Sequence, residues 1–138
     1  MTNFKQSIEE GYVKIVSPDR IKAKSLIKSG DEAISSAKKL PFEDTTLKSI
    51  IRELYEGLRQ YCEALGYLKG YKFLSHEAMT FFIKDVLNEG SLAAKFDRYR
   101  KIRNGINYYG DDVSSETVEE ALSEIPKLIS ELKRYIKL

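Results

Sequence analysis

The chain has 138 residues, of which 42% are hydrophobic and 32% are charged, and its formal net charge is +2. This composition suits one soluble domain, residues 1–138, and argues against disorder and membrane association. The nearly balanced charge excludes a globally basic nucleic-acid-binding protein, so any such site must come from local clustering. Cys62 is the single cysteine, which allows no internal disulfide, and we expect a reducing, cytoplasmic location.

The N-terminal third of the chain contains residues that typically begin and end helices. Residues 1–16 fit either a short helix or an extended arm. A long helix is predicted from Ser17, as its cap, to about Leu40, where Pro41 stops it. Gly30, near its middle, is expected to weaken it. Its predicted apolar positions are Ile21, Leu26 or Ile27, Ala33, Ile34 and Ala37.

The next segment has the most regular amphipathic pattern in the chain. It begins near Asp44 and ends near Gly66 and Gly70. Apolar residues recur at spacings of three and four, which is typical of a helix with one buried face. They are Leu47, Ile50, Ile51, Leu54, Leu58, Tyr61, Cys62 and Leu65. Cys62 is therefore predicted to be a core residue and not a nucleophile or metal ligand.

Three further helices are predicted in the C-terminal half. One runs from Ser75 to about Asn88, one from about Leu92 to Tyr108, and one from Ser114 or Ser115 to about Ile136. Pro126 lies inside the last helix and should bend it without ending it, because the periodicity continues beyond. No strand-like alternation is visible. The sequence therefore predicts an all-α, up-and-down bundle of four to five helices with sequential helices antiparallel.

The helix containing Arg103 is the main candidate for chemistry. On a helical wheel its apolar arc holds Leu92, Tyr99, Ile102, Ile106 and Tyr109, with Phe96 on the edge. Asp97, Arg98, Lys101 and Asn104 fall on the opposite side. Arg103 projects on the apolar side, and with Arg100 and Asn107 it forms a polar seam. The run of basic residues at 98–103 is otherwise typical of a solvated helix face.

An arginine on a buried face needs a partner, because an unpaired desolvated charge is costly. Three kinds of partner remain open. One is an internal carboxylate, namely Glu77, Glu53 or Glu56. The others are a second subunit and a phosphate-bearing ligand, which the planar guanidinium binds well. A structural ion pair without any ligand is an equal alternative.

The segment Tyr99–Gly110, with Arg103 followed by Asn104, resembles the signature helix of HEPN domains. That signature is an arginine, usually followed by a polar residue, and a histidine separated from the arginine by four to six residues. The histidine would fall at Tyr108, Tyr109 or Gly110, and none of these is histidine. Residues 70–79 and the order of helices also resemble archaeal HEPN-like proteins, so the resemblance covers about residues 17–138.

The resemblance implies a homodimer that binds RNA or a nucleotide through Arg103. In catalytic HEPN domains histidine handles the proton in metal-independent RNA cleavage and arginine stabilises the phosphate charge. A free tyrosine has a pKa near 10 and is a poor base at neutral pH. With Tyr108 at the histidine position, binding is therefore carried over more readily than catalysis. The implied catalytic pair is Arg103 with Tyr108. The implied ligand-binding residues are Arg100, Arg103, Asn104, Asn107 and Tyr108.

Two other functions stay open beside RNA or nucleotide binding. One is an interaction protein paired with a nucleotidyltransferase, as in the toxin–antitoxin pairs that HEPN domains resemble. The other is a divergent ribonuclease in which another histidine fills the missing role. His76 is the only histidine; it is either a surface residue of a first helical turn or, with Glu77, a supporting neighbour of Arg103. One cysteine and one histidine exclude a zinc-type site, and no cofactor is expected.

Overall fold

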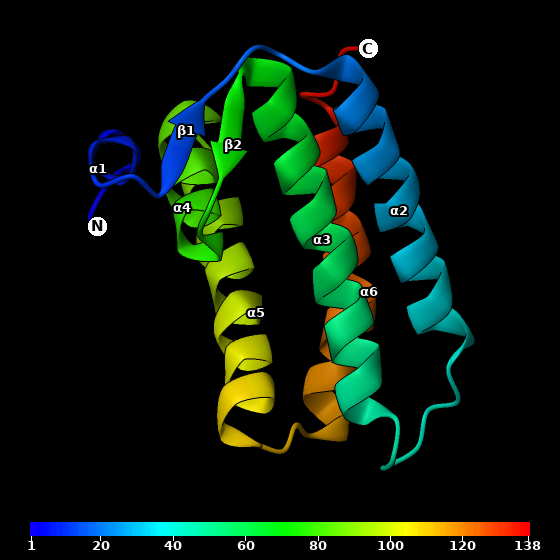
Figure 1. Cartoon of the computed structure of the whole chain (residues 1–138). Helices are drawn as coiled ribbons and strands as arrows, with labels where there is room; N and C mark the ends of the chain where they lie inside the picture. The colour runs from blue at the N-terminus through cyan, green and yellow to red at the C-terminus, as the bar shows by residue number, and fades with distance from the viewer.

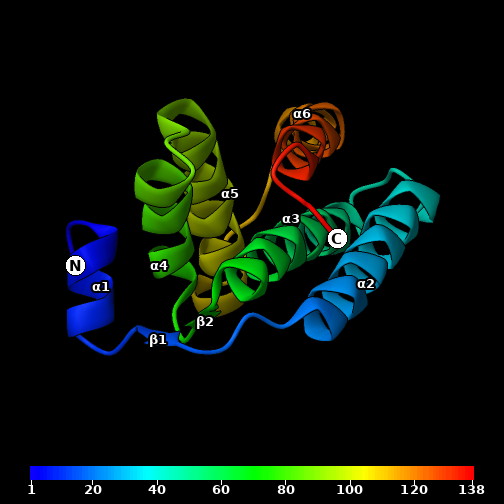
Figure 2. The same ribbon diagram turned by 90° about the horizontal axis from the view of Figure 1, so that it is seen from above.

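The computed structural model describes all residues, 1–138, as a bundle of helices with one small sheet. Four long helices alternate in direction along the chain, which is the predicted up-and-down arrangement (Figure 1). They are α2 (Arg20–Lys39), α3 (Leu47–Lys69), α5 (Gly90–Tyr109) and α6 (Ser115–Lys133). The short helix α4 (His76–Phe81) lies beside α5, and the short helix α1 (Phe4–Glu9) lies on the far side of α4 from α5 (Figure 2). No helix is both long and apolar enough to cross a membrane.

Helix α3 is the central element of the bundle. It packs against α2, α5 and α6, as the view from above in Figure 2 shows. All eight apolar residues predicted for its buried face are buried. Tyr55, which follows the same spacing, is buried as well and was missed. The prediction that Cys62 is a core residue is confirmed, and burial raises the pKa of its thiol.

Close contact between α2 and α3 depends on two glycines. A Cβ atom on Gly30 would lie 3.2 Å from the carbonyl oxygen of Gly57, and one on Gly57 would lie 3.0 Å from that of Gly30. Gly30, expected only to weaken α2, therefore lets the two helices approach. Besides Gly30, the fully buried residues of α2 are the alanines Ala23, Ala33 and Ala37.

The predicted start of α2 is two residues too early. Asp19, not Ser17, is the cap, and its Oδ1 accepts a hydrogen bond from the Lys22 amide at 2.9 Å. Ile21 was assigned to the apolar face but is 83% exposed. Ser17 lies in the extended link between the first strand and this helix. Similarly, α3 begins at Leu47 and not near Asp44, because Thr46 Oγ1 bonds back to the preceding loop.

The chain contains two short strands, although the sequence shows no strand-like alternation of useful length. Strands β1 (Val13–Ile15) and β2 (Tyr71–Phe73) pair antiparallel, with Val13 opposite Phe73. Three residues are too few to produce a visible alternation in the sequence. The N-terminal segment therefore contains both a short helix and an extended arm, and β2 leads directly into α4.

The remaining helices follow the predictions with two differences. The segment after Ser75 is regular only to Phe81 and continues as a π-helix, η1 (Phe82–Val86). Asn88, with φ of 57°, then turns the chain into α5. Pro126 lies inside α6, which continues to Lys133 as expected, and Ser114 Oγ caps its first turn.

Candidate functional site

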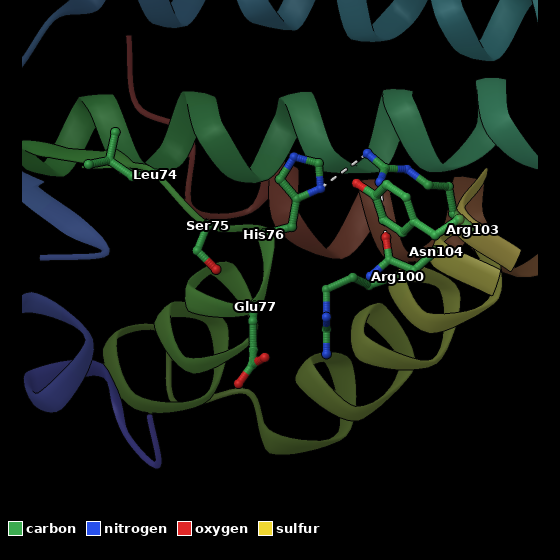
Figure 3. A pocket seen from close by; sticks show the side chains of 8 residues that line it. Leu74, Ser75, His76, Glu77, Arg100, Arg103 and Asn104 are labelled. Carbon is green, nitrogen blue, oxygen red and sulfur yellow. Dashed lines mark hydrogen bonds between the residues drawn. The ribbon is translucent and has the colours of Figure 1, made fainter. Parts of the chain in front are cut away.

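A pocket of about 370 Å³ lies between α5 and the start of α4. The α5 wall carries Arg100, Arg103, Asn104 and Tyr108. The opposite wall carries Leu74, Ser75, His76 and Glu77, which follow directly after β2. Most of these side chains are polar, and Figure 3 shows His76 of α4 pointing towards Arg103 of α5. Of the seven residues that the sequence singles out for this site, six line the pocket and only Asn107 does not.

Asn107, which the helical wheel groups with Arg103, does not line the pocket. Its side chain is exposed and its Oδ1 accepts a hydrogen bond from Arg52 Nε of α3 at 2.8 Å. Tyr109, assigned to the apolar arc, is 81% exposed, whereas Phe96 on the edge of that arc is fully buried. The buried face of α5 is therefore rotated from the predicted one towards Phe96.

Arg103 is half-buried and is held by neutral groups only. Its Nη1 donates to Asn104 Oδ1 at 3.0 Å, and its Nη2 donates to His76 Nδ1 at 3.3 Å (Figure 3). The guanidinium carbon lies 5.1 Å from the ring centre of Tyr55. No ion pair joins Arg103 to a carboxylate, so the predicted internal partners Glu53, Glu56 and Glu77 do not neutralise it. Arg103 therefore lines the pocket without an ion-pair partner.

Arg100 differs from Arg103 because it has a carboxylate partner. Its Nε and Nη2 both lie 2.8 Å from Asp97 Oδ1. Thr80 and Lys101 bind the same carboxylate. Burial acts to raise the pKa of Asp97, but hydrogen bonds from Arg100, Lys101 and Thr80 outweigh it and hold that pKa below its ordinary value. The ion pair fixes the direction of Arg100 along the pocket wall.

His76 is the histidine of this site, although it comes from α4 and not from α5. Its Nδ1 also lies 3.0 Å from the hydroxyl of Tyr55. Burial lowers the pKa of His76 to about 4, with Arg103 adding to the effect. Because an arginine can only donate, Nδ1 must be the acceptor and the proton of the neutral ring must be on Nε2. The ring is therefore neutral at pH 7.

Tyr55 is the site residue that sequence reasoning missed. It supports both Arg103, through its ring, and His76, through its hydroxyl. Burial raises the pKa of this hydroxyl, so it stays protonated as a donor to His76. The signal was present in the sequence: Tyr55 is four residues after Ile51 and three before Leu58 on the apolar stripe of α3.

No protein-family model matches the sequence, and no curated protein matches it.

Proposed function

We propose that this pocket binds a phosphate group of RNA or of a nucleotide, with Arg103 as its main contact. The observation that carries the proposal is a half-buried guanidinium without a carboxylate partner. A desolvated charge of this kind needs a counter-charge, and phosphate oxygens match the two-pronged geometry of guanidinium. The contacts of Arg103 to Asn104, His76 and Tyr55 leave N–H groups free to donate to such a ligand.

Neighbouring groups support the same ligand. Arg100 adds a second guanidinium whose direction is set by Asp97. The side-chain nitrogen of Asn104, Nδ2, makes no hydrogen bond within the chain and can donate one to a phosphate oxygen. Side-chain contacts hold these donors in place before the ligand arrives. Binding therefore costs little conformational entropy.

The resemblance to HEPN domains supports the proposal from a second direction. In that superfamily the arginine of the signature helix contacts the phosphate of RNA. Here Arg103 lies on α5, the penultimate long helix, and Tyr108, at the position of the family histidine, lines the same pocket. RNA binding at Arg103 is the function on which the resemblance and the pocket agree.

The test compares two arginines of the same helix. Arg103→Ala removes charge-assisted hydrogen bonds of about 1.5–3 kcal/mol, so we expect affinity for a short single-stranded RNA to fall about tenfold or more. Arg98→Ala is the control, because Arg98 bonds Glu120 on α6 and lies outside the pocket. Fluorescence anisotropy at low salt measures both, and circular dichroism checks the fold. Equal RNA binding by wild type and Arg103→Ala would contradict the proposal.

A metal-independent ribonuclease is the second candidate, and the contact between His76 and Arg103 favours it. Cleavage needs a base for the 2′-hydroxyl and a cation for the phosphate. His76 is neutral at pH 7 and, once Arg103 turns to a phosphate, its Nδ1 can accept the 2′-hydroxyl proton. The 2′-oxygen then bonds to phosphorus while the bond to the 5′-oxygen breaks. The leaving 5′-oxygen takes a proton from water, and the Tyr108 hydroxyl can donate a hydrogen bond to it.

Cleavage assays distinguish an enzyme from a binding module. If the protein is a ribonuclease, RNA is cut in the presence of EDTA and the products end in a 2′,3′-cyclic phosphate. We expect His76→Gln to slow cleavage by about 10² or more, the usual contribution of general base catalysis. Activity that persists in Arg103→Ala would indicate a contaminating nuclease. If the RNA stays intact and its binding depends on Arg103, the protein binds RNA without cleaving it.

A further inference from the structure

A carboxylate stands on the wall of the pocket opposite the two arginines. Glu77 is the second residue of α4 and is half-buried, and it lines the same pocket as Arg100 and Arg103. Figure 3 shows its side chain on the α4 side, across from Arg100 on the α5 side. No hydrogen bond or ion pair connects Glu77 to either arginine. Its two oxygens are thus available to a ligand.

This carboxylate works against a simple phosphate ligand. A phosphate held by Arg103 would feel the negative charge of Glu77 across the pocket, because both lie in a partly desolvated site. A ligand that complements both walls carries an anionic group at one end and hydrogen-bond donors at the other. A nucleotide has this division, with phosphate oxygens at one end and base N–H groups at the other.

Resting on the proposed function, we propose that Glu77 selects guanine by accepting hydrogen bonds from N1–H and N2–H₂ of the base. Guanine is the one RNA base with two adjacent donors on its Watson–Crick edge, and these match the two oxygens of a carboxylate. Adenine and cytosine present one amino group beside an acceptor, and uracil presents one N–H between two carbonyls, so each would place an acceptor against Glu77.

Two features of the pocket fit a base. Tyr108 lines it with a side chain that is 70% exposed, and an exposed aromatic ring is a stacking surface for bases. The volume of about 370 Å³ falls within the range of small-molecule sites, roughly 300–1,000 Å³. The phosphate contact, the base edge and the stacking surface are therefore all available in one cavity.

Calorimetric titration with GMP, AMP, CMP, UMP and inorganic phosphate tests the assignment. We expect wild type to bind GMP at least about fivefold more tightly than the other three nucleotides, the lower end of what a two-bond base contact gives. Glu77→Gln should lose this preference, because an amide presents only one acceptor. The same variant should bind inorganic phosphate more tightly, since a negative charge is removed.

The matched control is Glu116→Gln. Glu116 is also the second residue of its helix, α6, but is exposed and lies outside the pocket, so it carries the same helix-end effect without the site. If Glu77→Gln fails to fold, Glu77→Asp keeps the charge and shortens the side chain, and should weaken GMP while leaving phosphate affinity unchanged. Equal affinity of wild type for the four nucleotides, or a guanine preference that survives Glu77→Gln, overturns this inference alone. Absence of any nucleotide or phosphate binding overturns the proposed function as well.

Discussion

Arg103 keeps its charge available to a ligand because its hydrogen-bond partners, Asn104 and His76, are neutral. Had Glu56 or Glu77 paired with it, the site would be a structural ion pair of the kind that the sequence left open. Instead Glu56 is bound by Arg59 one turn further along α3. Burial acts to raise the pKa of Glu56, but the hydrogen bonds and charge of Arg59 outweigh it and lower that pKa. Glu56 therefore stays paired with Arg59.

The ionisation of His76 gives a test at the scale of one residue. Burial is the largest cause of its lowered pKa, and the cations Arg103, Arg59 and Arg100 add to it while Glu56 opposes them. His76 is the only histidine, so its NMR signal is identified without assignment. We expect a midpoint near pH 4 in the free protein. Phosphate bound at Arg103 should raise the midpoint, because an anion favours the imidazolium.

The same shift predicts how stability depends on pH. An unfolded histidine titrates near 6.5, whereas folded His76 titrates near 4, so between these values the unfolded chain binds more protons. The free energy of unfolding should therefore fall as the pH is lowered from about 6.5 towards 4. Urea unfolding of wild type and His76→Gln measures this, and the variant should lose less stability between pH 6.5 and 5. Identical slopes for the two proteins would show that His76 is not desolvated.

At the scale of secondary structure, the sequence predicts those elements whose apolar residues recur at a regular spacing. The stripe of α3 extends over about five turns, so each apolar residue is supported by several others, and all eight predicted core residues are buried. Elements without repetition were missed. Strands β1 and β2 have three residues each, and the widening of α4 into a π-helix follows no pattern of apolar spacing.

Candidate site residues divide in a similar way. Arg100, Arg103, Asn104 and Tyr108 lie on one helix, so a single periodic element brings them to the same wall. The contact of Arg103 with His76 joins residues 27 positions apart, and that with Tyr55 joins α5 to α3. Contacts of this kind depend on how helices pack against one another, which the period of one helix does not contain. Asn107 was misplaced for the same reason, since Arg52 of α3 draws it away from the pocket.

At the scale of the whole molecule, N-terminal residues hold the α4 wall of the pocket in place. Phe4 of α1 is buried, and its ring lies 5.0 Å from that of Tyr71 in β2 and 5.7 Å from that of Phe82 in η1. Its backbone amide donates to Asp85 Oδ2 at 2.8 Å. Because α4 connects β2 to η1, the wall that carries His76 and Glu77 is anchored at both ends by α1.

The homodimer and the nucleotidyltransferase partner remain predictions of the resemblance.

Phe4→Ala should therefore weaken both the fold and the α4 wall of the pocket. Truncating a buried phenylalanine costs about 3–5 kcal/mol, whereas Phe42→Ala, at a residue 45% exposed in the loop before α3, should cost much less. Urea unfolding gives the two free energies. Hydrogen exchange should then show lost protection in β2, α4 and η1 of Phe4→Ala, with α3 less affected because α2 and α6 pack against it. Equal destabilisation by the two substitutions, or uniform loss of protection across all helices, would contradict an anchoring role for α1.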